Sequence, residues 1–383
     1  MIKKKIVYVA TVYFAVNNFL VPHILESKKI FDVFVLTNTK NIDPMLKNTL
    51  LRNNIKLINI PFKRHISIIY DLWCMIKLIF FFLFNKITIC HSITPKAGLL
   101  SMIASLITQV PFRIHTFTGQ IWANHIGLKR KFFIFIDKII NLVSTHIIVD
   151  SRSQKKFLVK NNVIGTDSTV LGNGSIVGVD TNKFLFDEKI RIKIRNKLAI
   201  KNRAHVVLYL GRVTKDKGIC VLIDAIKKCL EQKLNVILLI VGPCEGLAKD
   251  DLFDHFEQKY KKKLKYIDYV NNPEDYMSAS DIFCIPSFRE GFGQVAIEAS
   301  SCGLPIIASN IYGLKDSVII NKTGYFFKNK SVSDLASKII YLINNKEIQK
   351  KMGDSGRSYV LDKFSQHNIV MLQNQFYKKI IVD

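Results

Sequence analysis

The sequence predicts an α/β protein made of two doubly wound domains, each with a parallel sheet between layers of helices. Short runs of apolar and β-branched residues alternate with longer helical patterns along nearly the whole chain. These runs are continuous rather than alternating, which is typical of parallel strands buried on both faces. A glycine-rich stretch, 171–180, interrupts the series midway, and the series then restarts. A chain of 383 residues is also long enough for two domains. We expect a cleft between the carboxyl ends of the two sets of strands.

The expected strands recur throughout both halves. They are 5–11, 33–38, 55–61, 87–92, 112–117, 145–151 and 169–172 in the first half, and 206–212, 236–243, 264–270, 282–287, 305–310 and 324–328 in the second. We expect residues 1–175 to form the first domain and 176–363 the second. The last segment, 364–383, has an amphipathic helical pattern with no strand after it, so we expect it to cross back to the first domain.

The chain is strongly basic, with 56 Lys and Arg against 30 Asp and Glu, a formal charge of +26. Because 49% of its residues are hydrophobic, it can bury a large core, which excludes an intrinsically disordered protein. The charge indicates an anionic partner: nucleic acid, a membrane surface or a phosphorylated substrate. A lysine-rich coding bias, which would scatter the charge without function, fits the composition equally well.

Targeting and redox signals are weak. The basic N-terminus and the apolar run after it imitate a signal peptide, but no small-residue cleavage site follows, so we expect a buried strand. The apolar stretch 72–84 is too short to span a bilayer, which takes about 20 residues. The seven cysteines are scattered without a Cys-x-x-Cys pair, which favours reduced thiols in a cytosolic protein over a disulfide framework or a zinc site.

One window is unusually poor in charge. From Gly291 to Leu314 the only charged residue is Glu298, although 22% of the whole chain is charged. A carboxylate in such an apolar helix normally has a dedicated partner. Glu290 stands just before a Gly-Phe-Gly turn whose backbone N–H groups could approach an anion at the start of the helix. By itself, the pattern also fits a solvated loop carboxylate at Glu290 and a surface helix charge at Glu298.

These residues carry a family resemblance. Glu290 and Glu298, with seven residues between them, match the Glu-x7-Glu motif of family 4 glycosyltransferases, which are retaining enzymes of the GT-B fold. Further segments are similar to that family at 209–225, 269–281, 281–309 and the Gly-Tyr pair 324–325. In the first half, residues 91–123 resemble a subgroup that acts in bacterial surface-polysaccharide (O-antigen and capsule) assembly. The resemblance implies a first domain on the acceptor side and a second domain that binds a nucleotide-sugar.

Arg212 and Lys217 follow a predicted strand, and two cations there could neutralise a leaving diphosphate without a metal ion. The resemblance implies the same role for them. It further implies that Glu298 binds the ribose hydroxyls and that Glu290 binds a hydroxyl of the donor sugar. The backbone amides of Gly291, Phe292 and Gly293 would bind the phosphate and the sugar. Tyr269 and Val270 would lie next to the nucleotide base.

In the first domain, the resemblance implies that His115, at a strand end, contacts the donor sugar. A lone histidine is more often structural, and its pattern alone favours that reading. One departure from the family is the loop after the first strand, which reads Thr-Val-Tyr-Phe-Ala at 11–15 where many members have a Gly-Gly pair. The donor site on this side should therefore be built differently.

The expected reaction is transfer of a sugar from a nucleotide-sugar, UDP-linked first of all, to a lipid-diphosphate-linked saccharide with retention of anomeric configuration. No cofactor or metal is expected, because no Asp-x-Asp-like site is evident. Two alternatives stay open: a sugar-nucleotide epimerase of the same architecture, and a basic nucleic-acid-binding protein. The second lacks aromatic, zinc-finger or basic-zipper motifs.

Both halves of the chain are basic, but one interval lacks acidic residues altogether. No acidic residue occurs between Asp71 and Asp137. The bases in that interval are Lys77, Lys86, Lys96, Arg113, Lys129, Arg130 and Lys131. They flank the most apolar stretch of the chain, which predicts a surface for an anionic membrane and a peripheral protein on the inner face of the cytoplasmic membrane. A plain core helix at 68–84 is the alternative.

Overall fold

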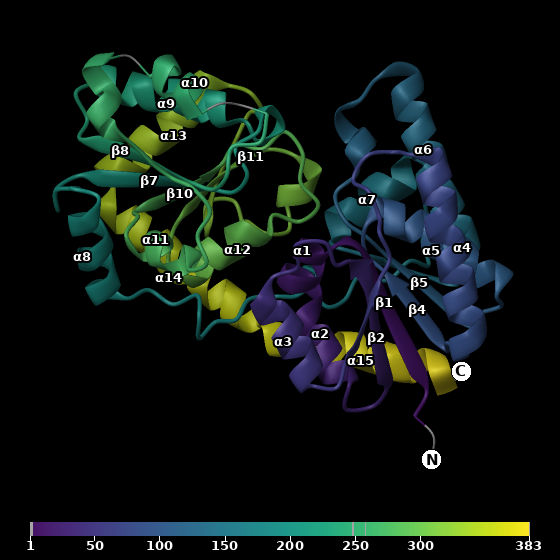
Figure 1. Ribbon diagram of the computed structural model, residues 1–383. Helices are drawn as coiled ribbons and strands as arrows, with labels where there is room; N and C mark the ends of the chain where they lie inside the picture. The colour runs from purple at the N-terminus through teal and green to yellow at the C-terminus, as the bar shows by residue number, and fades with distance from the viewer. Residues whose placement is uncertain (1–2, 247–248, 257, 383) are drawn as a thin grey trace. The chain divides into compact units, whose positions relative to one another are not determined.

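The chain folds into two units, each built on a six-stranded parallel sheet (Figure 1). The computed structural model describes residues 3–246, 249–256 and 258–382. The first unit comprises Met1–Gly178 together with Gln366–Asp383, and the second comprises Val179–Ser365. The bounds expected from the sequence, 175/176 and 363/364, lie within three residues of these.

The first unit has the strand order β3-β2-β1-β4-β5-β6. Its strands are β1 (Lys5–Val12), β2 (Asp32–Asn38), β3 (Lys56–Asn59), β4 (Ile89–Ser92), β5 (Phe112–Phe117) and β6 (His146–Val149). Its helices are α1 (Tyr13–Ala15), η1 (Val16–Leu20), α2 (Val21–Ser27), α3 (Pro44–Arg52), α4 (Ile68–Asn85), α5 (Pro95–Ile107), η2 (Ile121–Asn124), α6 (Gly127–Val143), α7 (Arg152–Lys160) and α15 (Gln366–Val382).

The second unit repeats this order as β9-β8-β7-β10-β11-β12. Its strands are β7 (His205–Leu210), β8 (Val236–Val241), β9 (Leu264–Ile267), β10 (Ile282–Ile285), β11 (Ile306–Ser309) and β12 (Gly324–Phe327). Its helices are α8 (Glu188–Lys197), η3 (Lys215–Lys217), α9 (Ile219–Glu231), α10 (Lys249–His255), η4 (Gln258–Lys263), α11 (Pro273–Ser278), α12 (Gln294–Ser301), η5 (Tyr312–Leu314), α13 (Val332–Asn344) and α14 (Lys346–Lys363).

Each sheet has an apolar core on both faces, as continuous apolar strands require. In the first unit, α4, α5, α6 and α7 contribute to one core, whereas α2, α3 and α15 contribute to the core on the opposite face. Tyr377 and Ile380 of α15 are buried in that second core, so the C-terminal segment is part of the first unit. The predicted fold class, two Rossmann-like doubly wound domains, is confirmed.

Twelve of the thirteen expected strands occur among the described residues. The exception is 169–172, where Thr169 forms only an isolated bridge with Ile148 of β6. The loop expected after the first strand is also different: β1 runs on to Val12, and α1 begins at the next residue, Tyr13. This abrupt strand-to-helix junction stands where many family members have two glycines.

The apolar stretch at 72–84 belongs to a longer helix than its sequence suggested. Helix α4 has 18 residues, so by length and composition it could cross a membrane. Its inner face nevertheless packs into the core of the sheet through Cys74, Leu78 and Phe82. The opposite face is exposed, so α4 is a surface helix and not the plain core helix that was the alternative.

Candidate active site

The candidate site residues of the second unit lie on loops at one edge of its sheet. Because the strands are parallel, the loops after β7, β8, β9, β10 and β11 all leave from the carboxyl edge. Strands β7 and β10 are neighbours at the centre of the sheet, where the strand order reverses. Ligands of doubly wound folds bind outside this switch point. Arg212 and Lys217 follow β7, and Glu290 follows β10.

The structure brings Lys217 and Glu290 into direct contact. The Lys217 Nζ lies 2.5 Å from Glu290 Oε1, and the two side chains are only 21% and 15% exposed. The two loops are also joined by their backbones, since the N–H of Phe288 donates to the carbonyl of Asp216 at 2.8 Å. Arg289 forms a second ion pair with Asp216 at 3.3 Å. Together these contacts hold a cation and a carboxylate at the switch point.

Arg212 is exposed at the same edge and pairs with a residue that the sequence did not single out. Its Nη1 lies 2.7 Å from Glu245 Oε2, on the loop after β8. The hydroxyl of Tyr209 donates to the carbonyl of Arg212 at 2.7 Å, and the N–H of Val213 donates to the carbonyl of Pro243 at 2.8 Å. The backbone of Arg212 is therefore fixed while its guanidinium faces solvent.

The Gly-Phe-Gly turn leads into α12 as predicted. Gly293 has a φ of +81° and precedes the first residue of the helix, a conformation that favours glycine. Phe292 is buried, and its ring lies 5.3 Å from that of Phe364. Its side chain thus faces the core, which leaves only its backbone for a ligand.

Gly313, which the sequence did not single out, lies directly against the backbone of Glu290. A Cβ atom added to Gly313, in η5, would lie 2.0 Å from the carbonyl oxygen of Glu290 and 3.1 Å from that of Gly291. Only a residue without a side chain allows the loop after β11 to approach this closely. The signal in the sequence is slight, a single glycine after a buried strand.

Glu298 lies on α12, about two turns beyond Glu290. Its carboxylate accepts a hydrogen bond from Gln294 Nε2 at 3.2 Å. Burial of the carboxylate, with Glu274 nearby, raises the pKa of Glu298 to about 7, although Gln294 and Lys183 oppose the rise. The group therefore changes its charge near neutral pH. No contact joins it to Lys217 or Glu290 among the described interactions.

Tyr269 and Val270 follow β9 at the same edge. Tyr269 is exposed and Val270 is half-buried against the core of the unit. An exposed aromatic ring there could stack on a planar group. Among the described interactions, no contact joins either residue to the Lys217–Glu290 pair.

His115 lies in the first unit, near the end of β5, and is enclosed. Its side chain is 1% exposed, and its Nδ1 lies 2.8 Å from the Ser92 hydroxyl. The ring packs edge-on against Phe117, and a Cβ at Gly98 would lie 2.4 Å from its Cε1 atom. Burial lowers the pKa of His115 to about 3, so the ring is neutral. Its contact with a donor sugar stays a prediction.

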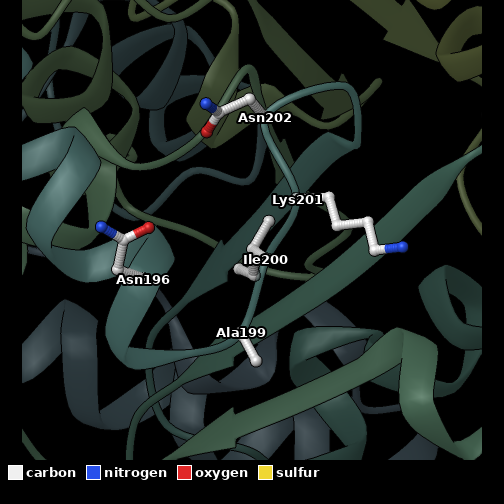
Figure 2. Close-up of a pocket in the computed structure, with 5 residues that line it drawn as sticks. All are labelled: Asn196, Ala199, Ile200, Lys201 and Asn202. Carbon is white, nitrogen blue, oxygen red and sulfur yellow. The ribbon is translucent and has the colours of Figure 1, made fainter.

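In the part of the chain that the structure describes, no three His, Cys, Asp or Glu side chains are grouped to hold a metal ion. Figure 2 shows a hollow lined by Asn196 and residues 199–202. It lies between α8 and the start of β7, at the amino edge of the sheet, so it is separate from the candidate site.

Comparisons with known proteins decide the family. Residues 190–359 match the family model described as "Glycosyl transferases group 1". The chain is 35% identical over 311 residues to the capsular polysaccharide biosynthesis glycosyltransferase CapM of Staphylococcus aureus, covering 81% of each chain. The chain belongs to the group 1 glycosyltransferases. This assignment confirms the predicted enzyme class and does not support the epimerase or the nucleic-acid-binding alternative.

Other similar proteins extend the comparison. This glycosyltransferase is 26% identical over 314 residues to the Escherichia coli UDP-Gal:alpha-D-GlcNAc-diphosphoundecaprenol alpha-1,3-galactosyltransferase, covering 79% of this chain and 78% of that protein. Its fold matches that of sucrose-phosphate synthase from Thermosynechococcus elongatus with a TM-score of 0.79 at 19% identity, covering 99% and 100% of the two chains. The Anabaena protein HepE, in complex with UDP and glucose, gives a TM-score of 0.79 at 18% identity over the same shares. These matches confirm the GT-B fold.

Proposed function

We propose that this glycosyltransferase transfers a sugar from a UDP-sugar to a lipid-diphosphate-linked saccharide, with retention of configuration and without a metal ion. The observation that carries the proposal is the Lys217–Glu290 pair at the switch point of the second sheet. A cation there can hold a diphosphate, and a carboxylate beside it can accept a hydrogen bond from a sugar hydroxyl.

The donor would lie along the carboxyl edge of the second unit. Arg212 and Lys217 would neutralise the diphosphate, with backbone amides of residues 291–293 at the start of α12 as further donors. Glu298 would accept hydrogen bonds from the ribose hydroxyls, and Tyr269 would lie against the base. The nucleotide is proposed to be UDP because HepE binds UDP and the E. coli relative is named for a UDP-sugar.

Retention follows from where the acceptor proton goes. The bond between the sugar C1 and the diphosphate oxygen breaks, and the pair of electrons stays on the diphosphate. That oxygen then takes the proton of the acceptor hydroxyl, whose oxygen bonds C1 on the face that the diphosphate left. Lys217 and Arg212 stabilise the charge that develops on the leaving group, so no covalent intermediate with Glu290 or His115 is needed.

The acceptor is proposed from the named relatives. CapM acts in capsular polysaccharide biosynthesis, and the name of the E. coli enzyme specifies an N-acetylated sugar on diphosphoundecaprenol. We therefore assign this chain to cell-surface polysaccharide assembly. Because such an acceptor is anchored in a bilayer, the enzyme would work peripherally on the inner face of the cytoplasmic membrane.

Binding of the donor should depend on pH through Glu298. Above its pKa of about 7 the group is a carboxylate and accepts two ribose hydroxyls; below it, the neutral acid accepts them poorly. The affinity for UDP-glucose, whose diphosphate does not titrate in this range, should fall as the pH decreases through 7. Calorimetric titration of the wild type and of Glu298→Gln measures this. The Glu298→Gln variant should bind more weakly with a flat pH profile, and an equally steep profile in that variant would refute the role.

Turnover should be unchanged in EDTA, because Arg212 and Lys217 supply the positive charge that a divalent ion supplies elsewhere. Rates measured after extensive dialysis against EDTA, with and without added Mg²⁺, test this. A strict requirement for Mg²⁺ would count against the metal-free site.

The proposal as a whole is tested by a donor screen. UDP-, GDP- and dTDP-linked sugars, with UDP-N-acetylated sugars first, are offered with undecaprenyl-diphosphate-linked acceptors, and products are identified by mass spectrometry. Transfer from a UDP-sugar is the expected result. Conversion of the nucleotide-sugar without transfer to any acceptor would indicate epimerase chemistry instead.

A further inference from the structure

Helix α4 carries apolar side chains on its outer face as well as its inner one. The outer residues recur at helical spacing. Among them, the side chain of Phe84 is 82% exposed and that of Ile69 is 86% exposed. The full set is Ile68, Ile69, Leu72, Trp73, Ile76, Phe80, Leu83 and Phe84. A helix that is apolar all round is normally enclosed by protein or by lipid. Since no described part of the chain covers this face, something outside the chain should.

Helix α6 presents a second exposed apolar face. Leu128, Phe132, Phe135 and Leu142 recur at helical spacing along it and are all exposed, as is Ile126 just before the helix. Helices α4 and α6 both pack against α5, and all three contribute to the same core (Figure 1). The two exposed faces therefore belong to one helix layer of the first unit.

This layer has no exposed carboxylate. Residues 44–143 contain only two acidic side chains, Asp71 and Asp137. Asp71 is paired with Lys96, whose Nζ lies 2.8 Å from Oδ1, and both are about one-seventh exposed. Asp137 is buried and accepts a hydrogen bond from Trp122 Nε1 at 2.7 Å. All the exposed charge that residues 44–143 carry is therefore positive.

Cations stand beside the apolar side chains. Lys77 Nζ lies 5.2 Å from the centre of the Trp73 ring, so its ammonium group sits over the outer face of α4. Lys86, Lys129, Lys131 and Lys138 are exposed at or near the ends of α4 and along α6. Exposed apolar side chains bordered by lysines fit the headgroup region of an anionic bilayer, where the apolar groups enter the acyl boundary and the amines meet lipid phosphates.

We propose that the outer faces of α4 and α6, together the membrane-contact face, bind the surface of an anionic membrane. A second copy of this chain fits less well, because two such faces would bring like charges together without a carboxylate to pair them. Insertion of α4 across the bilayer would remove Cys74, Leu78 and Phe82 from the core of the sheet. The purpose of this contact, access to a lipid-linked acceptor, rests on the proposed function; the contact itself does not.

Flotation with vesicles tests the contact. Full-length wild type should float with phosphatidylcholine–phosphatidylglycerol vesicles (3:1) and not with phosphatidylcholine alone. Ile69→Ser/Phe84→Ser should bind the anionic vesicles at least tenfold more weakly. Met45→Ser/Ile320→Ser, which removes exposed apolar side chains from α3 and from the second unit, should bind as the wild type does.

Charge reversal gives a second, independent comparison between a variant of the membrane-contact face and a control variant. Lys129→Glu/Lys131→Glu should weaken binding to the anionic vesicles, whereas Lys350→Glu/Lys351→Glu on α14, an equal change in net charge, should weaken it much less. Circular dichroism and UDP binding on each variant show whether the fold and the donor site are intact.

Equal flotation of the face variants and their controls, or no flotation of the wild type, would overturn the proposal. So would a wild-type dimer that sediments as a monomer after Ile69→Ser/Phe84→Ser, since the face would then bind a second copy. Normal flotation of a wild type that fails to bind UDP would support the membrane contact and contradict the donor site.

Discussion

Replacing Lys217 with alanine should lower turnover by about 10²-fold or more, the scale of losing one preorganised contact to developing charge. The Lys217 ammonium group is largely enclosed, and the loop after β10 fixes it against Glu290. Its position is therefore set before the donor arrives. Glu290→Ala should lower turnover to a similar extent, because the donor sugar loses a hydrogen-bond acceptor and Lys217 loses its partner.

Three measurements separate catalysis from folding in this case. Lys215→Ala, an exposed lysine on the same turn, should have nearly wild-type kinetics. The double variant Lys217→Ala/Glu290→Ala should lose much less than the product of the single losses, because the two side chains act as a pair. The melting temperature of each variant should stay close to that of the wild type, so the fall in turnover is not caused by unfolding. Near-wild-type turnover in both single variants would refute the assignment of the site.

Gly313→Ala should reduce turnover at least tenfold although residue 313 would touch no substrate. The added Cβ would lie 2.0 Å from the carbonyl oxygen of Glu290, a distance that only a shift of backbone can relieve. That shift moves the Glu290 loop, and misplacement of a reacting group by about 1 Å can cost a factor of 10² in rate. Steady-state kinetics with a saturating donor, together with thermal unfolding, measure the two effects.

The matched control is Gly165→Ala in the first unit. There the added Cβ would meet Asp167 Oδ1 at 2.4 Å, the end of an exposed side chain that can rotate away. This variant should keep both turnover and stability. If Gly313→Ala is as active as Gly165→Ala, the loop after β11 does not hold Glu290 in place.

The fold was predictable because buried parallel strands leave a plain pattern. Runs such as VILLIV at 236–241 are typical of strands enclosed on both faces, and the chain repeats them with helices between. The strand predicted at 169–172 was wrong, because Thr169 forms a single isolated bridge with Ile148 of β6. Whether a strand pairs depends on a sheet edge elsewhere in the chain, and a local pattern does not contain that information.

The candidate site was only partly predictable. Glu290 was found because the Glu-x7-Glu motif fixes its spacing from Glu298, and Lys217 was found because it follows a predicted strand just after Arg212. The structure joins Lys217 to Glu290. The roles of Gly313 and Glu245 were missed because they arise from contacts between loops that follow different strands. Likewise, the sequence of α4 does not tell which of its two apolar faces is covered. Packing against α5 and the sheet decides that, and it leaves Ile69 and Phe84 outside.

The anomeric configuration of the product tests the central claim most directly. A UDP-sugar labelled with ¹³C at C1 is incubated with wild-type enzyme, an undecaprenyl-diphosphate-linked acceptor and EDTA, and the new linkage is examined by NMR. We predict that the product has the same configuration at C1 as the donor and that Lys217→Ala forms it about 10²-fold more slowly. A product of inverted configuration would contradict the account, because the departing diphosphate could not then have taken the acceptor's proton on the same face.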